Sequence, residues 1–347
     1  MPTTSPHVSI VVPAYNAEAT LPHVLAPLQS LPPDWEVVVA DDHSSDATAE
    51  IARQFGARVV TSAGFRCDHA ARNTGARAAR GDVLVFLDAD VVASVPTLVE
   101  AVRRHERENA GCVFAVYDRG AHLPDVVSRY KNFWIRHTTL TAPRPLRWVN
   151  TSLAVIRRAH LEQIGGLDEN FSRRQGGGDL HFGTRIAKQC GAVLADDEIQ
   201  VTHLKRFGLS GLARNDFLRA RGWFRLALAQ RGAGGVLRRP RLANVGARFS
   251  WACLATAAGT ALLALGVFRP PLMVAGAAAL AASAACNGDF LVAAARQRVR
   301  GWPLFVPLLW FDQLACAAGL AVELGAQLRR RATRRSGPLA LPHTDHP

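Results

Sequence analysis

Hydrophobic positions in the first half of the chain form short apolar runs separated by segments with helical spacing. The runs are rich in Val, Ile and Leu, and they cover residues 8–12, 37–40, 58–61 and 83–87. Between the first two runs, apolar residues recur every three or four positions, at Leu21, Val24, Leu25 and Leu28. Alternation of apolar strands with amphipathic helices predicts an α/β domain built around a parallel sheet.

The last third of the chain is far more apolar. Residues 249–268 contain no charged side chain, and neither do residues 271–288. A helix of about 20 residues reaches about 30 Å, enough to cross the hydrocarbon core of a membrane. We therefore predict a membrane hairpin of 249–268 and 271–293, followed by a third apolar helix at 303–328. Helices buried inside a soluble protein are the alternative.

The third apolar stretch carries Asp312 and Glu323, which are 11 residues apart and would share one face of a helix after about three turns. A helix with one polar face is typical of the membrane interface. The alternative is a third crossing whose acids face other helices. We favour the interface, because a crossing would place the arginines of 329–335 outside, against the positive-inside rule.

These patterns divide the chain into four parts. We predict an α/β domain at 1–215, a basic amphipathic connector at 216–248, a membrane region at 249–328 and a basic, disordered tail at 329–347. The first residues carry no basic segment followed by an apolar one, as a secretory signal would. We therefore expect a multi-pass protein of the cell membrane with its α/β domain in the cytoplasm.

The chain is strongly basic, with 41 Lys and Arg against 28 Asp and Glu and a formal charge of +13. Many of these arginines flank the apolar segments, a position that favours contact with anionic lipids rather than nucleic acid. The six cysteines include no Cys-x-x-Cys pair, so neither a zinc site nor a disulfide framework is predicted.

Carboxylates stand at the ends of predicted strands. Asp88 and Asp90 follow the run at 83–87, and Asp41 and Asp42 follow the run at 37–40. The carboxyl edge is where open α/β sheets bind ligands. Asp88 and Asp90 are separated by one residue and share one face of an extended chain, so together they could hold a divalent cation that also binds phosphate oxygens. A solvated turn is the alternative.

Several motifs occur in a fixed order: Val-Pro-Ala-Tyr-Asn at 12–16, Ala-Asp-Asp-His-Ser-Ser-Asp-Ala-Thr at 40–48, Ala-Arg-Asn-Thr-Gly-Ala at 71–76, Leu-Asp-Ala-Asp at 87–90 and Ile-Gly-Gly-Leu-Asp-Glu at 164–169. This ordered set resembles the inverting family-2 glycosyltransferases, of the membrane-anchored bacterial type, over residues 7–215. The resemblance implies a GT-A fold, a Rossmann-like domain that binds nucleotide diphosphate sugars, and therefore a glycosyltransferase catalytic domain at 1–215.

The resemblance also implies roles for individual residues. Pro13, Tyr15, Asp41 and Asp42 would surround the nucleotide base. Arg72 would lie beside the nucleotide, together with Asp88. Asp90 would bind Mg²⁺ or Mn²⁺, and His203 would assist with the metal or the diphosphate, although a hydrogen-bonded structural histidine is the alternative.

Asp179 in Gly-Gly-Asp resembles the catalytic base of the family, which would deprotonate an acceptor hydroxyl. A helix N-cap is the alternative for this residue. Gly178 stands where the family usually has Glu, and His43 stands where it usually has Gly. The segment Arg219-Ala-Arg221-Gly-Trp223 is loosely similar to a Gln-x-x-Arg-Trp element of processive members, and its cations could screen a departing diphosphate.

Together these features predict a metal-dependent inverting transfer of a sugar, hexosyl in type, from a nucleotide diphosphate sugar, with UDP as the expected nucleotide. The expected acceptor is a hydroxyl of a lipid, a lipid-linked molecule or a cell-envelope glycan. Two other functions stay open. One is a nucleotidyl- or phosphotransferase that uses the same metal-diphosphate edge, and the other is a non-catalytic protein that binds a nucleotide sugar or a lipid.

Overall fold

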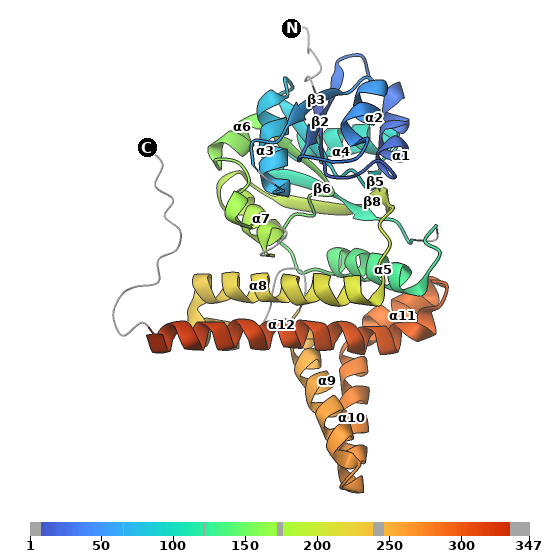
Figure 1. The fold of residues 1–347 in the computed structure, drawn as a ribbon, viewed down its shortest axis with the longest axis vertical. Coiled ribbons are helices and arrows are strands. Elements are labelled where there is room, and N and C mark those ends of the chain that lie inside the picture. Colours follow the sequence, from blue (N-terminus) through green and yellow to red (C-terminus); the bar gives the residue numbers. More distant parts are fainter. Residues whose placement is uncertain (1–7, 65, 121, 172–175, 239–245, 334–347) are drawn as a thin grey trace.

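The computed structural model describes residues 8–64, 66–120, 122–171, 176–238 and 246–333. An α/β domain stands on a layer of long helices, and a pair of helices projects from the opposite side of that layer (Figure 1). The alternating pattern of the sequence is therefore confirmed as an α/β fold.

The α/β domain contains one sheet of eight strands in the order β3-β2-β1-β4-β7-β6-β8-β5. Strands β1 to β4 run parallel, and β7 is antiparallel to both of its neighbours, β4 and β6. The strands span Val8–Ala14 (β1), Trp35–Asp41 (β2), Arg58–Thr61 (β3), Val83–Leu87 (β4), Val91–Val92 (β5), Cys112–Tyr117 (β6), Leu153–Arg157 (β7) and Val193–His203 (β8).

Helices cover both faces of this sheet. Along β4, Val83, Val85 and Leu87 belong to one hydrophobic core, whereas Leu84 and Phe86 belong to the other. A strand buried on both faces must be apolar at every position, which explains the continuous runs in the sequence. The helices of this domain span Leu21–Leu25 (α1), Pro27–Ser30 (η1), Thr48–Gln54 (α2), Asp68–Ala78 (α3), Val95–Arg107 (α4), Val126–Leu140 (α5), Arg158–Gln163 (α6), Glu169–Phe171 (η2) and Gly178–Gln189 (α7).

The remaining helices form the lower part of the molecule. In Figure 1, α8 and α12 lie side by side beneath the sheet, and α9 and α10 form an antiparallel pair that points away from it. These helices span Leu209–Arg238 (α8), Ala247–Gly266 (α9), Pro270–Cys286 (α10), Gly288–Arg296 (α11), Trp302–Leu304 (η3) and Phe305–Thr333 (α12).

The lower helices differ in detail from the predicted segments. The predicted boundary at residue 215 falls inside α8, which is one continuous helix. The second helix of the hairpin, predicted at 271–293, is straight only to Cys286. After this residue the chain bends by 63° into α11. The predicted tail at 329–347 begins inside α12, and residues 334–347 lie outside the described residues.

Two of the described helices are long and apolar enough to cross a membrane, at Ala247–Gly266 and Trp302–Arg329, and the bent pair α10 and α11 is a third candidate. The acids of α12 do not face outward. Asp312 and Glu323 are 0% and 2% exposed, because they pack against α5 and α8. Gln313 instead accepts hydrogen bonds from Thr256 of α9 and Ser283 of α10.

Candidate active site

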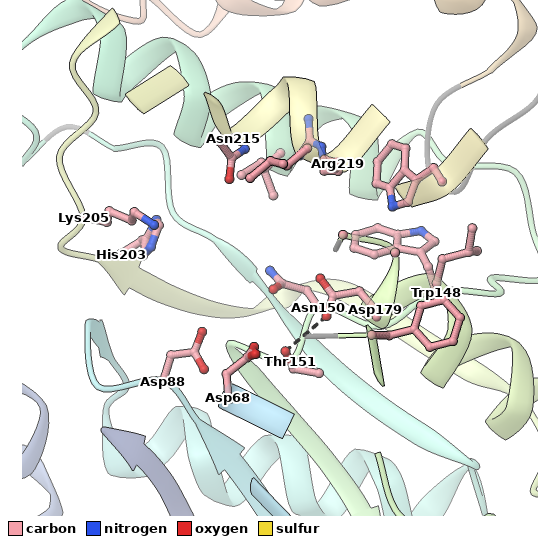
Figure 2. A pocket seen from close by; sticks show the side chains of 18 of the residues that line it. Asp68, Asp88, Trp148, Asn150, Thr151, Asp179, His203, Lys205, Asn215 and Arg219 are labelled. Carbon is pink, nitrogen blue, oxygen red and sulfur yellow. Dashed lines mark hydrogen bonds between the residues drawn. The ribbon is translucent and has the colours of Figure 1, made fainter. Parts of the chain in front are cut away.

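A pocket of about 530 Å³ lies between the carboxyl edge of the sheet, the start of α7 and the first turns of α8. Figure 2 shows acidic side chains on the wall formed by the α/β domain and basic or amide side chains from residues 203–219 on the facing wall. Four predicted site residues line this pocket: Arg72, Asp88, Asp179 and His203.

Arg72 and Asp88 form an ion pair at the floor of the pocket. Asp88 directly follows β4, and its Oδ1 accepts a hydrogen bond from Arg72 Nη2 at 2.5 Å. Arg72 also donates through Nη1 to Asp68 Oδ2 at 3.1 Å. The guanidinium is 1% exposed, and the two carboxylates hold its pKa above the usual value in spite of burial. Arg72 is therefore a fixed cation beside the strand-end acid.

Asp179 lies in the first turn of α7. The cap position of this helix is Gly177, and the carboxylate of Asp179 accepts a hydrogen bond from Thr151 Oγ1 at 3.3 Å. Burial by the surrounding pocket raises the pKa of Asp179, and Arg72 and His69 act in the opposite direction. A carboxylate with a raised pKa that faces a pocket suits a general base.

Three consecutive glycines before Asp179 are explained by close contacts. A Cβ on Gly176 would lie 2.5 Å from the carbonyl oxygen of Leu218 in α8, and Gly177 has a φ of +89°. A Cβ on Gly178 would lie 2.5 Å from Cε1 of His69. The imidazole of His69, whose Nδ1 donates to the carbonyl of Asp168 at 2.7 Å, therefore fills the space that a side chain at 178 would need.

Asp90 and His203 come together because β5 pairs with β8, which places Val91 opposite His203. The distance from His203 Nε2 to Asp90 Oδ2 is 3.7 Å. His203 is fixed by stacking on Tyr117, with ring centroids 4.4 Å apart. No group of three or more His, Cys, Asp or Glu side chains able to hold a metal occurs among the described residues. A carboxylate with one imidazole fits a cation that takes its other oxygen ligands from a diphosphate and water.

The four residues predicted around the nucleotide base lie at the ends of β1 and β2, outside the lining of the pocket. Pro13 pairs with Ala40, and Ala14 with Asp41. Tyr15 is 41% exposed, with the guanidinium of Arg66 5.4 Å from its ring centroid. Asp42 is buried, which raises its pKa.

His43 follows this acidic pair with a φ of 62°. This is the left-handed conformation that glycine adopts at low cost. The loop therefore keeps a glycine-like backbone although a histidine occupies the position.

The structure adds pocket residues that the sequence did not indicate. Asp68 and His69 come from α3, Trp148, Asn150 and Thr151 from the segment before β7, and Lys205 and Asn215 from the chain after β8. None of them belongs to a strand-end acidic motif, so only tertiary packing identifies them. Arg219 and Trp223, which the basic element near residue 220 had suggested, also line the pocket.

Comparison with known proteins identifies the family of the α/β domain. Residues 9–165 match the model of glycosyl transferase family 2. This part of the chain is a family-2 glycosyltransferase domain, and its fold is of the GT-A type.

Over 227 residues the chain is 31% identical to validoxylamine A glucosyltransferase of Streptomyces hygroscopicus subsp. limoneus, a match that covers 54% of this chain and 49% of that protein. The chain thus spans about half the length of this relative. It is also 36% identical over 108 residues to an undecaprenyl-phosphate 4-deoxy-4-formamido-L-arabinose transferase of Aeromonas hydrophila subsp. hydrophila, covering 27% of this chain and 33% of that protein.

Among solved structures, the mannosyltransferase PcManGT of Pyrobaculum calidifontis, in complex with GDP-Man and Mn²⁺, has a TM-score of 0.57 and 22% sequence identity. The match covers 92% of this chain and 88% of that one. At 22% sequence identity, this similarity shows that the two chains share a fold.

Proposed function

We propose that this chain is a membrane-associated, metal-dependent inverting glycosyltransferase that uses a nucleotide diphosphate sugar. The observation that carries the proposal is the single pocket that brings Asp88 and Arg72 from the sheet edge together with Asp179 from the start of α7. The family-2 domain and the glucosyltransferase relative support the same reaction class.

In this proposal the donor lies along the carboxyl edge of the sheet. Pro13, Tyr15, Asp41 and Asp42 surround the base, and Arg72 and Asp88 lie beside the nucleotide. Asp90 and His203 would hold Mg²⁺ or Mn²⁺, which when bound offsets the charge of the diphosphate. A fold neighbour bound to GDP-Man and Mn²⁺ supports a nucleotide sugar and a divalent ion, and the UDP nucleotide is our expectation from the sequence.

Asp179 acts on the acceptor. Its carboxylate takes the proton of an acceptor hydroxyl, and the oxygen forms a bond to the anomeric carbon of the sugar. The bond from that carbon to the diphosphate breaks, and its electron pair leaves with the nucleoside diphosphate. Attack from the face opposite the leaving group inverts the anomeric configuration. Thr151, which donates a hydrogen bond to Asp179, keeps the carboxylate directed into the pocket.

The acceptor in this proposal is a lipid or a lipid-linked glycan. The projecting pair of helices exposes large apolar side chains, with Val267 75%, Phe268 85% and Val274 73% exposed. Such a surface suits a bilayer and is unfavourable in water. The relative named an undecaprenyl-phosphate transferase supports a lipid-linked acceptor. The α/β domain would lie in the cytoplasm above anionic lipids.

Analysis of the nucleotide product tests the proposal. The purified full chain is incubated with Mg²⁺ or Mn²⁺, a panel of nucleotide sugars and extracted membrane lipids. A nucleoside diphosphate that appears only with a lipid acceptor supports glycosyl transfer. Pyrophosphate or a nucleoside monophosphate would instead indicate a nucleotidyl- or phosphotransferase, and donor binding without any product would indicate a non-catalytic protein.

A further inference from the structure

A buried cluster of charged side chains lies directly beneath the pocket, and the proposed reaction does not use it. Lys131 comes from α5, Asp216 from α8 and Asp312 from α12, and each is 0% exposed. The cluster therefore brings one fully buried charged residue from each of three helices together. Buried ions require close partners, so their geometry is fixed by the packing of the three helices.

The contacts within the cluster converge on Asp216. Lys131 Nζ lies 2.5 Å and Arg219 Nη2 lies 2.6 Å from the same oxygen, Asp216 Oδ1. Asp312 of α12 is linked to Asp216 through Cys316, whose Sγ lies 3.7 Å from Asp312 Oδ1 and 3.9 Å from the carbonyl oxygen of Asp216, and Asp312 Oδ2 accepts a hydrogen bond from Tyr130 Oη at 2.9 Å. Two cations and two acids from three helices therefore share one buried site.

One member of this cluster reaches the pocket. Arg219 lines the pocket wall that faces Asp88 (Figure 2), and its guanidinium lies 4.9 Å from the ring centroid of Trp223. The guanidinium of Arg219 is therefore held at two places, by Asp216 at its Nη2 and by the ring of Trp223 at its planar face. A long and flexible side chain is thus held in one place, which is the condition for a guanidinium to contact an anionic group with fixed geometry.

Helix α12 is pressed against α8 at the same level. A Cβ on Gly319 would lie 2.4 Å from the carbonyl oxygen of Phe217, the residue between Asp216 and Leu218. The next turn of α8 in turn packs on the loop before Asp179, since a Cβ on Gly222 would lie 2.3 Å from the carbonyl carbon of Gly176. The packing therefore runs without a gap from α12 through α8 to the pocket.

We propose that Asp216 and Asp312 are positioning residues for Arg219, so that helix α12 sets where the pocket presents this cation to an anionic group of its ligand. This inference rests on the proposed function for the identity of that ligand, which would be the diphosphate of the donor. Helix α12, which we propose to lie at the membrane, thereby sets the position of the Arg219 guanidinium in the pocket above it.

A double-mutant cycle tests the proposal in the full chain, solubilised with lipid. Arg219→Gln and Asp312→Asn are each expected to lower kcat/KM for sugar transfer at least about tenfold. The double variant is expected to be no worse than Arg219→Gln alone, because both changes remove the same interaction. Calorimetric affinity for inorganic diphosphate with Mg²⁺ gives a second readout that needs no transfer, and both single variants are expected to weaken it equally.

Glu323→Gln is the matched control. Glu323 is also a buried acid of α12, and it pairs with an arginine of α8, Arg221, at 3.3 Å, but neither residue lines the pocket. This variant should keep kcat/KM and diphosphate affinity within about twofold of the wild type. This control shows how far the loss of a buried acid from α12 changes activity when that acid does not line the pocket.

Three results would overturn the proposal: unchanged diphosphate affinity in Asp312→Asn, effects of the two single changes that multiply in the double variant, or unchanged affinity in Arg219→Gln. If Asp312→Asn does not yield folded protein, Gly319→Ala displaces α12 from α8 without removing a charge and must lower diphosphate affinity. A wild type that binds diphosphate through Arg219 but transfers no sugar would refute the proposed function and leave this inference standing.

Discussion

At the scale of single residues, the pocket is governed by the balance of charge around Asp179. Burial raises the pKa of its carboxyl group above the usual value of about 3.9, and the cation of Arg72 opposes that rise. A base works only when it is deprotonated, so catalysis must fail on the acid side of the raised pKa. The same ion pair that fixes Asp88 therefore also tunes the base.

This balance predicts a shift of the pH profile. In the wild type, kcat/KM should fall as the pH drops through the raised pKa of Asp179. Arg72→Gln removes the cation that lowers this pKa, so the midpoint of the acidic limb should move to higher pH, whatever the loss in absolute rate. The pH dependence of the residual rate measures this midpoint, and a midpoint that stays in place or moves to lower pH would contradict the assignment.

The pair of Asp90 and His203 leads to a prediction about the metal. Transfer should stop in excess EDTA and return with Mg²⁺ or Mn²⁺. Asp90→Asn keeps the shape of the side chain but removes an anionic ligand, so the cation concentration for half-maximal rate should rise on the order of tenfold or more. Glu50→Gln, which changes an exposed acid of α2, is the control and should leave this concentration unchanged. An unchanged transfer rate in excess EDTA would exclude a requirement for a divalent metal.

At the scale of elements, local patterns were enough to predict β1 to β4 and α1, because each is specified by its own apolar run or helical spacing. They were not enough for the order of the strands, since β7 enters between β4 and β6 through contacts far apart in the sequence. The acids at the strand ends could be predicted from sequence for the same local reason. His69, Asn150 and Thr151 could not, because only tertiary packing brings them beside Asp179.

The close packing of α8 and α12 is an element-scale feature that can be tested with two alanines. In Gly319→Ala the new methyl group would meet the carbonyl of Phe217, and such overpacking typically costs about 1–3 kcal/mol of stability. Gly325 lies on the same helix with no atom within 4 Å of a Cβ, so Gly325→Ala should be neutral or stabilise by up to about 1 kcal/mol. Thermal unfolding of the solubilised chain compares them, and equal midpoints would refute the contact.

At the scale of the whole molecule, the arrangement of the lower helices bears on membrane topology. The pair α9 and α10 points away from the α/β domain, whereas α12 lies across it beside α8 (Figure 1). The 20 residues of α9 reach about 30 Å. Arg269 stands at the far end of this pair, and Arg248, Arg296, Arg298 and Arg300 belong to the end near the α/β domain. From this distribution we propose a hairpin with its base in the cytoplasm and α12 in the interface.

Cysteine labelling on intact cells tests that topology. With a membrane-impermeant reagent, Phe268→Cys at the tip of the hairpin should react from outside, and Arg329→Cys near the end of α12 should react only after the cells are opened. The two sites are on one chain and serve as controls for each other. Labelling of Arg329→Cys from outside would mean that α12 crosses the membrane.

The proposed function is tested most sharply by Asp179→Asn, measured by single-turnover release of nucleoside diphosphate alongside calorimetric donor affinity. We expect nearly unchanged donor affinity and a transfer rate reduced by about two to four orders of magnitude, the usual contribution of a positioned general base. A change confined to stability, of about 1 kcal/mol as for the loss of an acid from the first turn of a helix, with a normal rate, would contradict the assignment of Asp179 as the base.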